Sequence, residues 1–153
     1  MQESDPNYTK IMAYVEHNPA GVLSTVGEDG PHGAVVYVIP ASHGTFCFVT
    51  KNHTKKYQNI VRQGAVSLTF FNEQESTTLQ ITGKAYVADN SQGLKEIVLD
   101  KITKAHAAIS NWLPPVTEIS EGEYAVIGIE ITYARLSDFA VMDVTGPTII
   151  EAR

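Results

Sequence analysis

Apolar and polar residues alternate along most of this chain, a pattern that predicts β-strands separated by short turns. Six segments carry the pattern: 21–26, 33–39, 46–50, 65–71, 77–88 and 124–136. Asp29-Gly30 lies between the first two segments and is typical of a hairpin turn. Gly83 interrupts the fifth segment and predicts a bulge or a close backbone approach. Residues 137–153 are less regular, and we expect one short extended piece there after Gly146.

Three other segments follow the helical period. The first two begin at the N-cap candidates Asp5 and Thr54. The third begins at about residue 89 and runs to about residue 109. The second helix is expected to end by Gly64 and to bury an apolar face made by Tyr57, Ile60 and Val61. Six strands joined mostly by short turns, with helices inserted, predict a mainly β (α+β) antiparallel barrel with peripheral helices. We expect one domain over residues 1–153.

The helix that begins at Thr54 has an unusual distribution of charge. Lys55 and Lys56 fall in its first turn and Lys51 lies just upstream, where cations face the positive end of the helix dipole. Each such cation costs about 0.3–1 kcal/mol of helix stability. A bound anion would offset this cost, because free backbone N–H groups, the Thr54 hydroxyl and two ammonium groups would converge on it. The pattern is compatible with a phosphate site, although lysine pairs on short helices are commonly just solvated.

The overall composition limits the classes of partner. The chain has 153 residues, 43% of them hydrophobic, and a formal net charge of −6. This charge argues against a general nucleic-acid-binding or anionic-membrane-binding surface. No apolar run reaches the length of a membrane span and the first residues carry no signal-peptide pattern, so a cytoplasmic protein is expected.

Several residues with reactive side chains have simple structural interpretations. Cys47 lies mid-strand between two phenylalanines and is expected to be a buried structural thiol. His32 and His43 lie in predicted turns without a second ligand at metal spacing, so we expect exposed histidines and no metal site. Trp112, in a Pro-rich loop, is equally compatible with a packing role and with a contact at the mouth of a ligand site.

The order of short motifs resembles that of the pyridoxamine 5′-phosphate oxidase-like flavoproteins, which are FMN-binding split barrels. The resemblance covers roughly residues 8 to 90, and 124–139 looks like the closing strand of that family. The motifs that carry it are Gly21-Val22-Leu23-Ser24-Thr25-Val26, Asp29-Gly30, Pro31-His32-Gly33, Gly44-Thr45-Phe46, Thr54-Lys55-Lys56, Asn59-Ile60 and Gly83-Lys84-Ala85.

The resemblance implies a six-stranded antiparallel split β-barrel with peripheral helices, and a homodimer with FMN at the interface. It implies that a Ser/Thr-Arg/Lys-Lys element holds the FMN phosphate, which Thr54, Lys55 and Lys56 match, with Lys51 nearby. The strand that runs along the flavin matches Gly33, Val35, Val36 and Tyr37. The strand end before the basic element matches Val49 and Thr50, and a polar flavin contact on the fifth strand falls on Thr78 or on Gln80.

The chain also departs from the family pattern. The authentic oxidases carry a C-terminal segment with Trp and Arg-His elements that recognise pyridoxamine phosphate, and no such segment is present here. Thr78 replaces the glutamine that is common in the oxidases. Two functions are therefore expected: an FMN-dependent oxidoreductase that takes hydride from a nicotinamide or similar small-molecule donor, or a protein that binds a flavin, F420 or haem without turnover. A third possibility is an empty barrel that serves as a dimeric interaction module.

Overall fold

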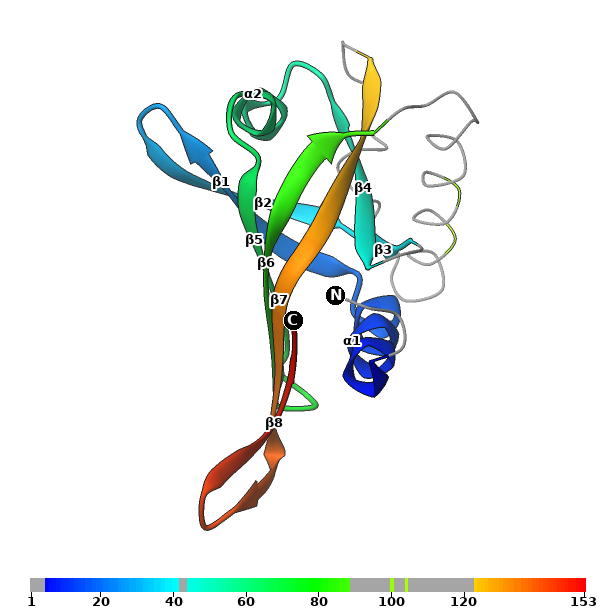
Figure 1. Cartoon of the computed structure of the whole chain (residues 1–153), viewed down its shortest axis with the longest axis vertical. Coiled ribbons are helices and arrows are strands. Elements are labelled where there is room, and N and C mark those ends of the chain that lie inside the picture. The colour runs from blue at the N-terminus through cyan, green and yellow to red at the C-terminus, as the bar shows by residue number, and fades with distance from the viewer. Residues whose placement is uncertain (1–4, 42–43, 89–99, 101–103, 105–122) are drawn as a thin grey trace.

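A computed structural model describes residues 5–41, 44–88, 100, 104 and 123–153 of the chain (Figure 1). The described part contains two helices and eight strands. The helices are α1 (Pro6–His17) and α2 (Lys55–Arg62). The strands are β1 (Ala20–Gly27), β2 (Gly30–Tyr37), β3 (Ile39–Pro40), β4 (Thr45–Lys51), β5 (Ala65–Asn72), β6 (Thr77–Val87), β7 (Tyr124–Asp143) and β8 (Gly146–Ala152).

All strand pairs are antiparallel and belong to one curved sheet. Its order is β2-β1-β5-β6-β7-β4-β3, with β8 added to β7. The sheet does not close, because its two ends are β2 and β3 and no ladder joins them. This is the split barrel that the sequence predicts, with eight strands in the described residues instead of six. The additional strands are the two-residue β3, which a proline limits, and β8.

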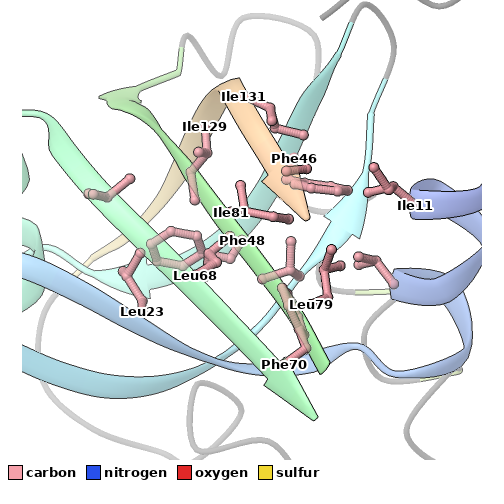
Figure 2. Packing of buried hydrophobic residues seen from close by; sticks show 14 of the residues in the cluster. Ile11, Leu23, Phe46, Phe48, Leu68, Phe70, Leu79, Ile81, Ile129 and Ile131 are labelled. Atoms are coloured by element: carbon pink, nitrogen blue, oxygen red, sulfur yellow. The ribbon is translucent and has the colours of Figure 1, made fainter. Parts of the chain in front are cut away.

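The core fills the inside of the curved sheet and is made by the inward positions of each alternating strand. Figure 2 shows Phe46 and Phe48 of β4 meeting Leu68, Leu79 and other aliphatic side chains from the neighbouring strands. Each of these side chains is at most 1% exposed. Burying such side chains contributes about 1.5–3 kcal/mol apiece relative to leaving them in water. The core therefore fixes the register of the strands.

Helix α1 covers one open side of this core. Asp5 caps it as predicted, since its carboxylate accepts a hydrogen bond of 2.8 Å from the N–H of Asn7, and Pro6 occupies the first turn. Ile11 and Val15 are completely buried against the core. The hydroxyl of Tyr8 accepts a hydrogen bond of 3.1 Å from the N–H of Gly44, which ties α1 to the start of β4.

The last two strands form an arm. β7 continues past the closing segment predicted from the sequence and turns at Gly146 into β8, and the tip of this hairpin projects beyond the rest of the fold (Figure 1). The register between the two strands shifts between Asp138 and Met142. The predicted irregularity at Gly83 is confirmed, because the β6–β7 register shifts between Thr82 and Gly83. Neither described helix has the length and apolar character needed to cross a membrane.

The buried face of α2 differs from the predicted one. Val61 is 62% exposed, whereas Asn59 is 6% exposed, because the amide of Asn59 reaches Thr25 on β1 and turns that face of the helix inward. Ile60 is buried as expected. Gly64 follows the C-cap, but its structural role is a close approach: a Cβ there would lie 2.5 Å from the carbonyl oxygen of Ala85.

Candidate functional site

The N-terminus of α2 is fixed to the end of β4 by two threonines. The Thr54 hydroxyl donates a hydrogen bond of 2.9 Å to the carbonyl of Lys51, and it accepts one of 3.4 Å from the N–H of Tyr57. It also lies 3.1 Å from the hydroxyl of Thr50, which is 2% exposed. Thr54 is therefore the predicted N-cap. Its hydroxyl proton is directed to the carbonyl of Lys51, and the expectation that this hydroxyl would serve an anion stays a prediction.

Two backbone donors remain free at this helix end. The N–H groups of Lys55 and Lys56 occupy the first two helical positions, which have no intrahelical acceptor, and they have no partner among the described residues. Lys55 is exposed and Lys56 is half-buried. Burial lowers the pKa of the Lys56 ammonium, because desolvation disfavours its charge. No carboxylate of the described part forms an ion pair with either lysine. This end of α2 is therefore cationic, with no described carboxylate paired to its lysines.

Lys51 has a different position. It is the last residue of β4, only 9% exposed, and its Nζ lies 3.8 Å from the centroid of the Tyr124 ring. Tyr124 is its direct partner on β7. A cation over an aromatic face is stabilised by the ring quadrupole, more strongly when it is desolvated. Lys51 is therefore held by the strand pair instead of projecting toward solvent like Lys55.

The expected flavin-contacting segment of β2 has two different faces. Gly33 and Val35 lie on the outer face and are exposed, Val35 to 51%. Val36 points the opposite way and belongs to the main core. Side chains of Val35 and Val36 therefore cannot cover one ligand together, so of these two valines only Val35 can face a ligand on the outer side of β2. The backbone along Gly33 and Val35 is the part of β2 that is open to a ligand.

Tyr37 and Val49 come together with Cys47 and Val126 in a second, smaller apolar cluster. This cluster lies on the face of β4 opposite to Phe46 and Phe48, since successive side chains of a strand alternate. Cys47 is 5% exposed, and burial raises the pKa of its thiol. The prediction of a buried structural thiol is confirmed.

Thr78 and Gln80 lie far along β6 from the α2 region. The segment that follows α2 meets β6 at Ala85, whose N–H donates a hydrogen bond of 2.7 Å to the carbonyl of Gly64. Five residues of strand separate Ala85 from Gln80, or roughly 16 Å, and Thr78 lies farther still. Thr78 lines a small apolar pocket of about 270 Å³ beside Phe71 and Phe139. One chain therefore places Thr78 and Gln80 well away from the point where the segment after α2 meets β6.

Two sequence predictions lie outside the described residues: Trp112, as a contact at the mouth of the site, and His43. The predicted helix over about 89–109 also falls there, except that Asp100 and Lys104 are helical and form an ion pair of 2.8 Å. His32 is described and was predicted wrongly. It lies in β2 instead of a turn, it is half-buried, and its Nδ1 is buried without a hydrogen-bond partner in the described part.

The sequence pattern did not reveal a polar pocket of about 360 Å³ beside the start of α2. His53, just before the helix, is at its edge. The other lining residues come from one face of α2 and from the β1–β2 turn: Lys55, Gln58, Asn59, Arg62, Glu28 and Asp29. The i, i+3, i+4, i+7 spacing of the helix residues could have indicated a shared face. No sequence feature places the β1–β2 turn opposite that face. Within the described ranges, no three His, Cys, Asp or Glu side chains gather to hold a metal ion.

Comparison with known proteins assigns the fold to a family. The family model described as pyridoxamine 5′-phosphate oxidase matches residues 9–138. The chain belongs to the pyridoxamine 5′-phosphate oxidase family. The matched range includes both β2 and the basic start of α2, so the family assignment covers the whole region described above. No curated protein matches the chain.

Three solved structures illustrate how this family member resembles others in fold. A pyridoxamine 5′-phosphate oxidase-related, FMN-binding protein from Nostoc punctiforme is 11% identical, with 99% of this chain and 98% of that chain covered and a TM-score of 0.65. General stress protein 26 from Bacillus anthracis is 20% identical, with coverages of 84% and 92% and a TM-score of 0.62. An F420 reductase is 19% identical, with coverages of 79% and 93% and a TM-score of 0.58.

Proposed function

We propose that this chain binds FMN and transfers electrons between a reduced small-molecule carrier and a small acceptor. The observation that carries the proposal is the N-terminus of α2. The backbone N–H groups of Lys55 and of the half-buried Lys56 have no hydrogen-bond partner among the described residues, and no described carboxylate pairs with either side chain. A phosphate supplies the missing anion at such a helix end.

The residues present fit the flavin part as well as the phosphate. Gly33 has no Cβ and Val35 is exposed, so the outer backbone of β2 is open for approach by an apolar ring with polar edges. Backbone N–H and C=O groups along β2 would serve the polar atoms of such a ring, which need partners once they leave water. Lys55 and Lys56 would hold the phosphate through charge-assisted hydrogen bonds.

The redox chemistry would be supplied by the bound flavin, while the chain supplies position. No His, Asp or Glu occurs in 33–38 or 49–50, the segments matched to the flavin. These segments offer backbone and apolar groups, so we expect them to orient the donor and exclude water without moving a proton. Holding a hydride donor close to the flavin is a matter of proximity and orientation. The rate of flavin reduction should then be nearly constant across neutral pH.

Anaerobic mixing of the FMN-loaded protein with NADH or NADPH tests the redox proposal. We expect the oxidised flavin absorbance to bleach with at least one of the two donors, at a rate that changes little between pH 6 and 8. If both donors leave the flavin oxidised, the protein is a flavin carrier or takes its electrons from another donor. FMN binding itself is checked separately by equilibrium dialysis.

F420 is the second candidate cofactor, because one structure of similar fold is an F420 reductase. F420 also carries a phosphate, so the same helix end would serve it. Equilibrium titration of the ligand-free protein with F420 and with FMN distinguishes the two. A dissociation constant lower for F420 than for FMN would move the proposal to F420-dependent chemistry.

We further propose that the protein works as a homodimer. Val22 and Val35 are direct partners on β1 and β2, and both are exposed on the outer face of the sheet, to 41% and 51%. Phe71 is 71% exposed on β5. Apolar side chains exposed together on a sheet face commonly mark an interaction surface. A second copy would cover this face. It would also provide contacts for Thr78 and Gln80, which one chain keeps away from α2.

A further inference from the structure

The polar pocket beside α2 shares Lys55 with the proposed phosphate site, and its other lining residues have no role in the proposed phosphate contacts. Its helical wall follows one face of α2 from Lys55 to Arg62, which is about 10 Å along the helix axis. The opposite wall is the β1–β2 turn with Glu28 and Asp29. A volume of about 360 Å³ lies within the range of small-molecule sites. The pocket thus extends from the basic helix end and is large enough for part of a ligand.

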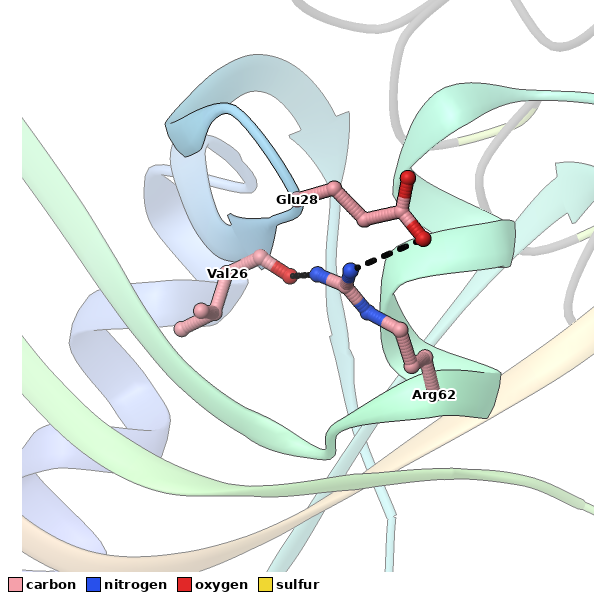
Figure 3. Close-up of polar contacts among 3 residues, drawn as sticks. All are labelled: Val26, Glu28 and Arg62. Carbon is pink, nitrogen blue, oxygen red and sulfur yellow. Dashed lines mark hydrogen bonds and ion pairs between the residues drawn. The ribbon is translucent and has the colours of Figure 1, made fainter.

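The two walls are held together by specific contacts. Arg62 Nη2 donates a hydrogen bond of 2.8 Å to the carbonyl of Val26, and its Nη1 lies 3.4 Å from Glu28 Oε1 (Figure 3). Below them, Asn59 Nδ2 donates a hydrogen bond of 3.0 Å to the Thr25 hydroxyl. The guanidinium and the buried amide fix the turn relative to the helix, so the pocket is preformed.

One amide of the pocket has a free acceptor. Asn59 lines the pocket, its Nδ2 bonds to Thr25, and its Oδ1 accepts no hydrogen bond from any described residue. A ligand donor that reaches Asn59 Oδ1 would take the place of water there. Gln58, exposed one position earlier, offers a second amide with both donor and acceptor atoms.

The charges of the pocket narrow the class of ligand. Lys55 and Arg62 offset Glu28 and Asp29, and Arg62 is already paired with Glu28. A polyanionic tail would meet the two carboxylates, so this lining does not favour it. Carboxylates accept hydrogen bonds from ribose hydroxyls, and amide side chains pair with the edges of a base. The lining therefore suits an uncharged, hydroxyl-rich group next to a phosphate.

We propose that this pocket binds the nucleoside part of a nucleotide whose phosphate lies at the N-terminus of α2. The inference rests on the proposed phosphate site. FAD contains such a nucleoside, joined to the phosphate that it shares with FMN, whereas a nicotinamide donor would need the helix end that the FMN phosphate already occupies. Asp29 would accept from the ribose, and Asn59 with Gln58 would contact the base.

The test measures dissociation constants of FMN, FAD and AMP with the ligand-free protein. Asp29→Asn keeps a residue that suits the turn while removing the charge, and Gln58→Ala removes one amide from the helix. Glu16→Gln on α1 and Gln63→Ala after α2 are matched controls, because both residues are exposed and neither lines the pocket.

AMP should bind the ligand-free protein, and each pocket variant should weaken that binding by about tenfold while the controls leave it unchanged. FAD binding about tenfold tighter than FMN, with the difference lost in Asp29→Asn, assigns the pocket to the cofactor. Equal FMN and FAD affinities, or AMP binding that is absent or insensitive to both pocket variants, would overturn the inference. Failure of FMN to bind, with AMP still held by the pocket, would instead count against the proposed flavin function alone.

Discussion

The ammonium of Lys51 lies 3.8 Å from the centroid of the Tyr124 ring, and the two residues face each other across β4 and β7. This pair joins the strand that precedes the basic helix to the strand that closes the sheet. Lys51 is thereby fixed in a buried position, while Lys55 and Lys56 start the next element. Of the three neighbouring lysines, the last two are the ones in the first turn of α2.

Removing the two helix lysines tests the phosphate site. We expect Lys55→Ala with Lys56→Ala to weaken FMN binding by on the order of a hundredfold or more, since two charge-assisted contacts are lost. Fluorescence titration measures the affinity, and circular dichroism checks the fold. A double variant of Lys10 and Lys84, both exposed and on other elements, changes the net charge equally. Equal affinity in the two double variants would exclude the assignment.

The positive charge of Lys56 should lower the stability of the folded protein when no anion is bound. Burial lowers the pKa of its ammonium in the folded chain, so carrying the charge disfavours folding at neutral pH. That cost disappears as the pH rises through the lowered pKa to the unfolded value, where both states are neutral. Lys56→Met should therefore raise the Tm of the ligand-free protein at pH 7, with a smaller gain at strongly alkaline pH. Lys55→Met, at an exposed position, should change the Tm little; a lower Tm for Lys56→Met would contradict the argument.

Gly64 should not accept a side chain. A Cβ there would lie 2.5 Å from the carbonyl oxygen of Ala85, so a backbone segment must shift. We expect Gly64→Ala to reduce the free energy of unfolding by about 1–3 kcal/mol in urea denaturation. Gly33→Ala is the control, because its Cβ would meet only Val22 Cγ1, at 3.6 Å. Similar unfolding midpoints for the two variants would show that the strand contact can relax.

Cys47 should react slowly with thiol reagents. It is buried, and its raised pKa lowers the thiolate fraction below that of a free cysteine at the same pH. At pH 8 we expect the native protein to label at least about a hundredfold more slowly than the unfolded protein. A colorimetric disulfide reagent with and without guanidinium measures both rates, and rapid labelling of the native chain would refute the buried assignment.

A charged substitution tests the proposed dimer surface. Val22→Lys places an ammonium on the exposed face of β1, and we expect it to raise the dimer dissociation constant by roughly tenfold or more, since a charge buried in an interface is costly. Val144→Lys, at the fully exposed hairpin tip, is the matched control. Light scattering over a concentration series gives both constants. A monomeric mass for the unchanged protein at micromolar concentration would oppose the dimer.

Local features of the chain were predictable from the sequence because their causes are local. Asp5 and Thr54 cap helices through their own side chains, and the predicted hairpin at Asp29-Gly30 is present, with Gly30 as the first residue of β2. The alternation of Leu79 and Ile81 with polar neighbours predicts which face of β6 is buried. Cys47, between two phenylalanines, was correctly placed in the interior.

Prediction from the sequence failed where a side chain is buried by an element that lies far away along the chain. Helical periodicity favoured Val61 as buried, yet α2 turns Asn59 inward because Thr25 on β1 offers its hydroxyl. His32 looked like a turn residue, but the β1–β2 ladder extends to Gly27 and Gly30 and includes it. Periodicity predicts how side chains are distributed around an element, and it does not predict which element covers them.

The sequence by itself determined the strands, the caps and the basic start of α2, since these depend on neighbouring residues and on backbone preferences. Only the tertiary structure decided that Lys51 packs on Tyr124 and that Glu28 and Asp29 face α2 across a pocket. These contacts join residues far apart in the chain. They exist because β1 pairs with β5, and β4 with β7, as the sheet curves around one core.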